Sequence, residues 1–226
     1  MARAHTAETT LPDNRTSRTG ELSLDEWYRM PEDEPGELVD GRLVEEEVPG
    51  YVHEFLVLLL GRIFGDWVLP RGGFVGGSDA KFAVGPGRGR KPDLTVYFPE
   101  SPPPPPAGLI AVPPDIAVEI VSPTPGDVRR DRVDKMDDYA TFGIRYYWIL
   151  DPQSRTLDIF ELGVDRIAGR PAAPRRTDSA SHALPGRQYT QVLEAAGGTI
   201  ATVPGCDGLT VDLDALWAEI GRLEKR

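Results

Sequence analysis

Two acidic residues stand out because each lies in an apolar stretch whose composition is typical of a β-strand. Asp93 opens the stretch at residues 92–98, and Glu119 interrupts the stretch at residues 116–121. Burying an unpaired carboxylate is costly, so a carboxylate within a buried strand needs a partner. Two carboxylates brought together from adjacent strands favour a divalent cation that prefers oxygen ligands, and Mg²⁺ or Mn²⁺ would suit them.

Glu119 has a second interpretation, as a solvated residue or as the partner of an arginine. Alternation along a strand places it on the same face as Ala117 and Val121, which is the less apolar face of that stretch. An acid on such a face can be solvated or can form an ion pair, and arginine is abundant in the chain. Residue types alone leave both interpretations of Glu119 open.

The composition predicts one soluble globular domain. The chain has 226 residues, of which 40% are hydrophobic and 27% are charged, and this length is enough to bury a sizeable core. We expect that domain at residues 22–226. Residues 1–21 are polar and lack the apolar core of a signal peptide, so we expect them to form a disordered tail.

Charge and cysteine content exclude several classes of protein. A formal net charge of −11 argues against a protein that coats nucleic acid nonspecifically, although a local basic surface stays open. The single Cys206 excludes an internal disulfide, and no Cys/His cluster resembles a zinc site, so we expect a cytoplasmic protein. The longest apolar run, residues 55–60, is far shorter than the ~20 residues that cross a bilayer, and we expect no membrane association.

Local patterns predict helices and strands in alternation, and hence an α/β (α+β) fold with a mixed β-sheet flanked by helices. Ser23 and Glu26 form the pattern of a helix-capping box, and Asp40-Gly41 is a favoured hairpin turn. We expect helices at residues 24–28, 51–67, 127–142 and 213–223. We expect strands at residues 37–39, 42–44, 73–75, 79–84, 92–98, 116–121, 144–150, 156–160, 189–193 and 199–203. The remaining segments are expected as a turn at residues 85–90, an extended proline loop at 102–106 and a mobile loop at 170–187.

Several short motifs, taken together at their spacing, resemble one known family. They are Pro92-Asp93, residues 118–123, residues 131–139 with Lys135, Gly143 and residues 147–152. Residues 37–41, His53 at the start of a helix, and residues 204–209 match the same layout. Over residues 22–220 the chain resembles the Uma-two family of bacterial putative restriction endonucleases, which belongs to the PD-(D/E)XK nuclease superfamily.

The resemblance implies a restriction-endonuclease-like sheet on which Asp93 and Glu119 project from adjacent strands and hold Mg²⁺ or Mn²⁺. In such nucleases the metal binds the scissile phosphate and lowers the pKa of the attacking water. The expected substrate is nucleic acid, with DNA preferred. Glu37, in its family-like context at residues 37–41, is expected near the metal as an accessory acid, although an acid beside a hairpin turn is also an ordinary surface residue.

The chain departs from the superfamily pattern at one position. A lysine normally lies two residues after the strand glutamate, whereas this chain has Val121 there. Lysine occurs only at positions 81, 91, 135 and 225, and the resemblance favours Lys135 as the replacement. The alternative for Lys135 is a surface ion pair with Asp131, four residues earlier, which would contribute only ~0.3–0.5 kcal/mol.

The leading hypothesis is therefore a Mg²⁺-dependent endonuclease whose site residues are Asp93, Glu119, Lys135 and Glu37. Two alternatives come from other classes of protein. One is a catalytically inactive module with the nuclease fold that binds nucleic acid or a partner protein, and the other is a dimerising structural protein without an active site. The missing strand lysine favours the alternatives, and a homodimer stays open under each hypothesis.

Overall fold

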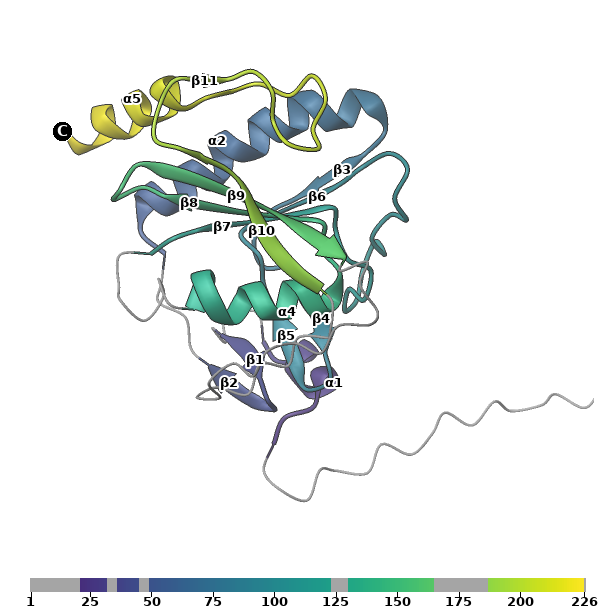
Figure 1. The fold of residues 1–226 in the computed structure, drawn as a ribbon. Coiled ribbons are helices and arrows are strands. Elements are labelled where there is room, and N and C mark those ends of the chain that lie inside the picture. The colour runs from purple at the N-terminus through teal and green to yellow at the C-terminus, as the bar shows by residue number, and fades with distance from the viewer. Residues whose placement is uncertain (1–20, 32–35, 45–48, 123–129, 165–186, 226) are drawn as a thin grey trace, which may run out of the picture.

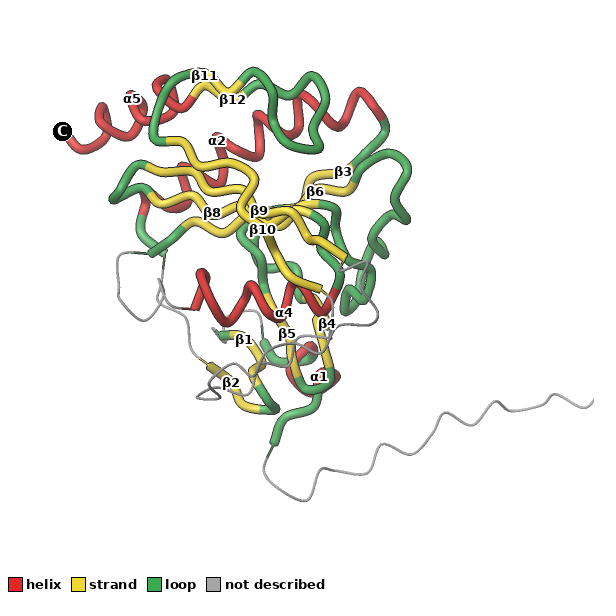
Figure 2. Tube along the Cα trace, viewed as in Figure 1, coloured by secondary structure: helices red, strands yellow, loops and turns green. Residues whose placement is uncertain are grey.

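The computed structural model describes residues 21–31, 36–44, 49–122, 130–164 and 187–225. A six-stranded mixed sheet lies at the centre of this part of the chain (Figures 1 and 2). Its strands run in the order β10-β9-β8-β7-β6-β3, and β7 pairs with β8 in parallel while the other neighbours are antiparallel. They are β3 (Phe74–Gly76), β6 (Leu94–Tyr97), β7 (Ile116–Ile120), β8 (Tyr146–Asp151), β9 (Thr156–Val164) and β10 (Arg187–Ala195).

Helices cover both faces of this sheet. Helices α2 (Tyr51–Val68) and α5 (Leu213–Glu224) lie over one face, and α4 (Lys135–Phe142) lies over the other (Figure 1). Leu56, Leu60 and Phe64 of α2 pack into the core on the first face, because they recur at the helical period of three to four residues. The segment that carries α4 connects β7 to β8, as a parallel pair requires a crossover.

A second, four-stranded antiparallel sheet lies on the far side of α4, so that α4 is covered by β-structure above and below (Figure 1). Its strand order is β2-β1-β5-β4, with β1 (Glu37–Val39), β2 (Arg42–Val44), β4 (Phe82–Gly85) and β5 (Arg88–Arg90). The segment at residues 85–90, expected to be a turn throughout, is a turn only around Gly87. Its second half forms β5, because Gly89 lacks the side chain that would overlap the indole of Trp27.

The predicted caps and turns are confirmed where the structure describes them. Ser23 and Glu26 form both hydrogen bonds of a capping box at the start of α1 (Leu24–Tyr28). Asp40 and Gly41 take positive φ angles of 50° and 74° in the hairpin between β1 and β2. Gly143, at φ 99°, ends α4. These local signals fix the ends of the elements that carry the candidate site.

The remaining elements are short. They are the 3₁₀ turn Leu69–Arg71, the π-helical turn Arg130–Asp134, and the strands β11 (Thr199–Ile200) and β12 (Val211–Asp212), which pair with each other. The predicted helix at residues 127–142 is therefore described from Arg130 onward, as a π-turn followed by α4. Residues 102–106 form an exposed loop without helix or strand, as expected.

Two expectations concern segments that the structure does not describe. The predicted disordered tail falls outside the described residues except for Glu21, and the predicted mobile loop at 170–187 does so except for Arg187, which begins β10. The single domain expected at residues 22–226 stays a prediction. No helix in the described part of the chain is long and apolar enough to cross a membrane.

Candidate active site

Glu119 lies in the middle of β7 and faces α4. Its side chain is only 2% exposed, and both carboxylate oxygens accept hydrogen bonds. The ammonium of Lys135 donates to Oε2 at 2.8 Å, and the hydroxyl of Tyr139 donates to Oε1 at 2.5 Å. Lys135 and Tyr139 reach the same carboxylate because they lie one turn apart on α4. The solvated interpretation of Glu119 is wrong, and among the described residues Glu119 forms an ion pair with Lys135.

Tyr139 is fully buried next to this carboxylate. Burial and the negative charge of Glu119 raise the pKa of the Tyr139 hydroxyl well above its ordinary value. The hydroxyl therefore stays protonated at neutral pH and serves as a fixed hydrogen-bond donor. Tyr139 therefore orients the Glu119 carboxylate and adds no charge to the site.

Lys135, the first residue of α4, is 3% exposed. Lys135 is therefore a buried ammonium, and the side chain of Asp131, its alternative partner, lies outside the described part of the chain. Besides the bond to Glu119, its ammonium lies 3.7 Å from Oε1 of Glu37. The structure thus brings together three of the four predicted site residues, namely Glu37, Glu119 and Lys135.

Glu37 enters this cluster from β1 of the small sheet and is 1% exposed. Oε2 accepts a 2.6 Å hydrogen bond from Arg90, and Oε1 accepts a 2.8 Å bond from the backbone N–H of Lys91. Burial alone would raise the pKa of Glu37, but the charges of Lys135 and Arg90 outweigh it and hold this pKa below its ordinary value. Glu37 is therefore an ionised, buried carboxylate and not the exposed residue that its place beside a hairpin turn also allowed.

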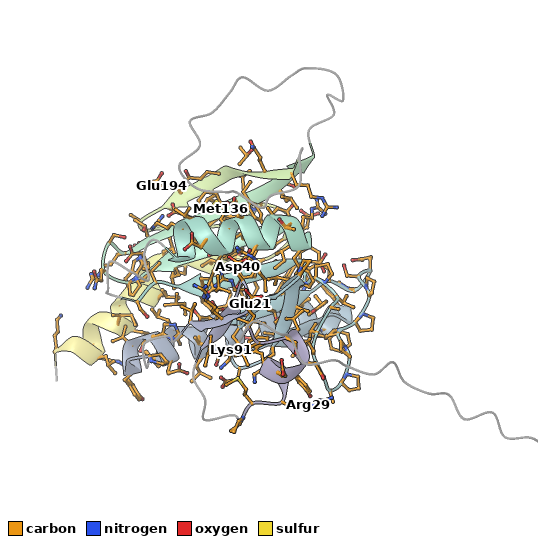
Figure 3. All side chains as sticks on the ribbon, turned by 90° about the horizontal axis from the view of Figure 1, so that it is seen from below. Glu21, Arg29, Asp40, Lys91, Met136 and Glu194 are labelled. Atoms are coloured by element: carbon orange, nitrogen blue, oxygen red, sulfur yellow. The ribbon has the colours of Figure 1, made fainter. Side chains whose placement is uncertain are left out.

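A chain of ion pairs extends from Glu37 to the surface. Arg90 also donates a 2.7 Å hydrogen bond from Nε to Oδ2 of Asp138, and its Nη2 lies 2.6 Å from the same oxygen. Asp138 accepts a second hydrogen bond, of 2.6 Å, from Arg88, which in turn pairs with Asp40. Asp40, labelled in Figure 3, has a side chain that is 58% exposed, so the chain of charges ends in solvent.

Asp93 lies one residue before β6, on the segment that joins the two sheets. Leu94 pairs with Val118, so the next position of the same antiparallel ladder places Asp93 beside Glu119. Its Oδ2 accepts a 2.7 Å hydrogen bond from the backbone N–H of Ile120 and lies 3.1 Å from Nε2 of His53. Asp93 is therefore adjacent to Glu119 along the backbone but has partners of its own.

The partners of the two carboxylates come from helices on opposite faces of the large sheet. His53 lies in the first turn of α2, whereas Lys135 and Tyr139 belong to α4. Asp93 and His53 keep 15% and 13% of their side chains exposed, so solvent reaches them, unlike Glu119. That Asp93 and Glu119 share one metal ion stays a prediction.

His53, which the family layout places at the start of a helix, is an ion-pair partner of Asp93. Burial alone would lower the pKa of His53, but the hydrogen bond and negative charge of Asp93, with the charge of Glu54, raise it above the ordinary value. His53 is thus protonated more readily than a free imidazole.

Comparison with known proteins identifies the family. Residues 24–195 match the family model Uma2, whose description is "Putative restriction endonuclease". The chain belongs to the Uma2 family. No match was found among curated proteins.

Among solved structures, the fold is similar to that in a crystal structure of a putative nuclease belonging to DUF820 from Anabaena variabilis ATCC 29413. The two share 18% sequence identity with a TM-score of 0.58, over 87% of this chain and 98% of that chain. At this identity the likeness shows the fold alone, and it confirms the mixed α/β sheet flanked by helices.

The donor chemistry of this Uma2 site fits a hard divalent cation. Asp93 and Glu119 supply carboxylate oxygens from neighbouring strands, which are the ligands that Mg²⁺ and Mn²⁺ prefer. Within the described part of the chain, no three His, Cys, Asp or Glu side chains converge closely enough to form a metal site as they stand. Glu119 would have to release one of its two donors, Lys135 or Tyr139, to accept an ion.

Sequence reasoning missed Arg90, Asp138 and Tyr139 as members of this Uma2 cluster. Tyr139 falls in the helix expected at residues 127–142 without a role of its own, and Arg90 falls in the turn expected at residues 85–90. One signal was present, because Lys135, Asp138 and Tyr139 lie at helical spacing and therefore form a polar stripe on one side of α4. Nothing in the local sequence marked Arg90, whose partners lie 48 and 53 positions away.

Proposed function

We propose that the chain is a metal-dependent nuclease that hydrolyses phosphodiester bonds in DNA. The observation that carries the proposal is the 2.8 Å contact between the Lys135 ammonium and Glu119. The superfamily pattern needs a lysine beside the strand glutamate, and Val121 cannot supply one. Lys135 on α4 places an ammonium beside that carboxylate. The lysine–glutamate contact of the pattern is therefore present, although the lysine does not lie two residues after Glu119.

Asp93 and Glu119 would hold Mg²⁺ or Mn²⁺. When bound, the ion would bind the scissile phosphate and lower the pKa of the attacking water. Lys135 offers a compact ammonium that can orient a water molecule or stabilise negative charge on a phosphate oxygen. Tyr139 keeps Glu119 oriented through the second oxygen. His53 orients Asp93 through Oδ2 and leaves the other oxygen of that carboxylate for a ligand.

Membership in the Uma2 family supports restriction-endonuclease activity and DNA as the substrate. The fit of the carboxylates to hard cations supports the metal. A location in the cytoplasm and assembly as a homodimer stay predictions.

One observation favours the alternative of an inactive module with the nuclease fold that binds nucleic acid or a partner protein. Glu119 is 2% exposed and both of its oxygens are bonded within the protein. A carboxylate in this state cannot bind a metal without rearrangement. The alternative therefore predicts a stable site that takes up no ion.

A cleavage assay separates the two proposals. Supercoiled plasmid DNA is incubated with the wild type and with Asp93→Asn, in Mg²⁺, in Mn²⁺ and in chelator. Glu219→Gln is the matched control, because Glu219 lies on α5 in an exposed pair with Arg222. Metal-dependent cleavage by the wild type and the control, but not by Asp93→Asn, supports the nuclease. Intact plasmid under every condition supports the inactive module.

A further inference from the structure

We infer that Glu37 and Arg90 are positioning residues that hold the Lys135 ammonium against Glu119, and that Glu37 is not a ligand of the metal. The inference deepens the proposed function and rests on it in one respect, because the role of Lys135 in cleavage belongs to that function. The evidence for the positioning role is the arrangement of the buried charges around Lys135.

Glu37 is already surrounded by donors. Arg90, the backbone N–H of Lys91 and the ammonium of Lys135 lie at 2.6, 2.8 and 3.7 Å from its carboxylate oxygens. With 1% of the side chain exposed, no solvent reaches the carboxylate. A metal ligand must present a free oxygen lone pair to the ion, whereas the oxygens of Glu37 are directed at three cationic or N–H groups. We therefore assign Glu37 a role in holding Lys135 and not the role of an accessory metal ligand.

Arg90 fixes Glu37 and α4 at the same time. From β5 it donates one hydrogen bond to Glu37 on β1 and one to Asp138 on α4, and its Nη2 also lies 2.6 Å from Oδ2 of Asp138. Asp138 lies three residues after Lys135, so it shares a side of the helix with the ammonium. Arg90 is 1% exposed, and a guanidinium offers its donors in a rigid planar fork. Displacing Arg90 would free both the helix and the carboxylate that hold Lys135.

The charges alternate along this cluster. The carboxylates of Glu119, Glu37 and Asp138 are separated by the cations of Lys135 and Arg90, and Arg88 follows Asp138. Each cation is thus placed between two acids, so a shift of one charge leaves a neighbour without its partner in a low-dielectric interior. An ammonium held in this way stays at Glu119 before any substrate arrives, which is the preorganisation that catalysis by a fixed charge requires.

Lysine ammonium signals in NMR test the inference without relying on activity. The chain has four lysines, so selective ¹⁵N labelling gives at most four ammonium signals. A buried, hydrogen-bonded ammonium exchanges slowly with water, and we expect a signal from Lys135 that Lys135→Met removes. Glu37→Gln and Arg90→Met are expected to shift or abolish this signal, whereas Glu219→Gln leaves it unchanged. A Lys135 signal that is the same in Glu37→Gln and the wild type, or absent from the wild type, would overturn the inference.

Arg90→Met removes one cation from each of two buried acids, Glu37 and Asp138, and can prevent folding. The double variant Glu37→Gln/Arg90→Met removes one charge of each sign and keeps Asp138 paired with Arg88. The same shift or loss of the Lys135 signal is expected in this variant. An unchanged signal in the folded double variant also overturns the inference.

Binding of Mn²⁺, followed by electron paramagnetic resonance, tests whether Glu37 is a ligand of the metal. Glu37→Gln is expected not to weaken Mn²⁺ binding, whereas Asp93→Asn weakens it by about tenfold or more. A loss in Glu37→Gln as large as that in Asp93→Asn identifies Glu37 as a ligand and overturns the inference.

Cleavage kinetics separate this inference from the proposed function. In an active wild type, Glu37→Gln is expected to lower kcat by about 10–100-fold with KM unchanged, as for other supporting residues of a site. An unchanged kcat in Glu37→Gln overturns the positioning role alone. An inactive wild type contradicts the proposed function, and the ammonium signals then still decide whether Glu37 and Arg90 hold Lys135.

Discussion

The ammonium of Lys135 lies 2.8 Å from Oε2 of Glu119, although the two residues are 16 positions apart and belong to different elements. Glu119 comes from the middle of β7, and Lys135 from the first turn of α4. The contact gives the strand glutamate the cation that Val121 cannot provide. Loss of the strand lysine is therefore compatible with an active nuclease.

Removing the ammonium is expected to abolish most cleavage. In Lys135→Ala the rate of DNA cleavage with Mg²⁺ or Mn²⁺ should fall by about 10²–10³-fold, because a preorganised charge is lost from the site. Lys135→Arg should not restore the rate, since a planar guanidinium does not replace a compact ammonium. Initial rates of plasmid cleavage check this, with Lys225→Met as the control. Equal rates in the wild type and Lys135→Ala would remove Lys135 from the mechanism, and inactivity of both would favour the binding module.

Breaking the buried ion pairs should cost stability. Asp138→Ala leaves the buried Arg90 without one of its two acids, and we expect the free energy of unfolding to fall by about 3–5 kcal/mol. Glu219→Ala removes an exposed partner of Arg222 and should cost at most about 1 kcal/mol. Urea unfolding measures both values. A cost for Asp138→Ala no larger than that of the control would show that the buried cluster contributes little.

Glu37 should make stability depend on pH in the acid range. Its folded-state pKa lies below the ordinary value of about 4.3, so the unfolded chain takes up the proton more readily. The stabilisation from ionised Glu37 is present above about pH 4.3 and is lost as the pH falls through the lower pKa of the folded state. Unfolding free energies at a series of pH values should thus show the wild type and Glu37→Gln converging on acidification. A difference that stays constant across this range would contradict the ionised state of Glu37.

The packing of β5 should tolerate no side chain at Gly89. A Cβ there would overlap the indole of Trp27, so Gly89→Ala should destabilise the protein by about 1–3 kcal/mol and displace the flanking Arg88 and Arg90. Gly61→Ala is the matched control, because nothing lies within 4 Å of a Cβ at that helical position. It should be neutral or stabilising by up to about 1 kcal/mol. Thermal unfolding compares the two, and equal effects would contradict the close approach of Trp27.

Most of the local structure around the candidate site could be predicted from the sequence. Alternation of apolar residues predicted the strand around Glu119, helical periodicity predicted the helix from Tyr51, and Asp40-Gly41 predicted the first hairpin. These signals work because each depends on neighbours in the chain. The adjacency of the strands after Asp93 and around Glu119 also followed from their order.

The small sheet and its charges could not be predicted in this way. Strand β5 has three residues, of which two are arginines and one is glycine, so it shows no apolar alternation. Arg90 is buried only because β1 and α4, distant in sequence, provide acids on either side of it. Lys135 was identified through family resemblance more than through composition, since the position of α4 between two sheets is a tertiary property.

Anomalous scattering from a crystal soaked in Mn²⁺ tests most directly whether Asp93 and Glu119 form a metal site beside Lys135. We predict one peak with carboxylate oxygens of both residues about 2.1–2.2 Å away, and with Glu119 released from Lys135 or Tyr139. A saturating soak that leaves no peak there, with the bonds from Lys135 and Tyr139 to Glu119 both intact, would contradict it.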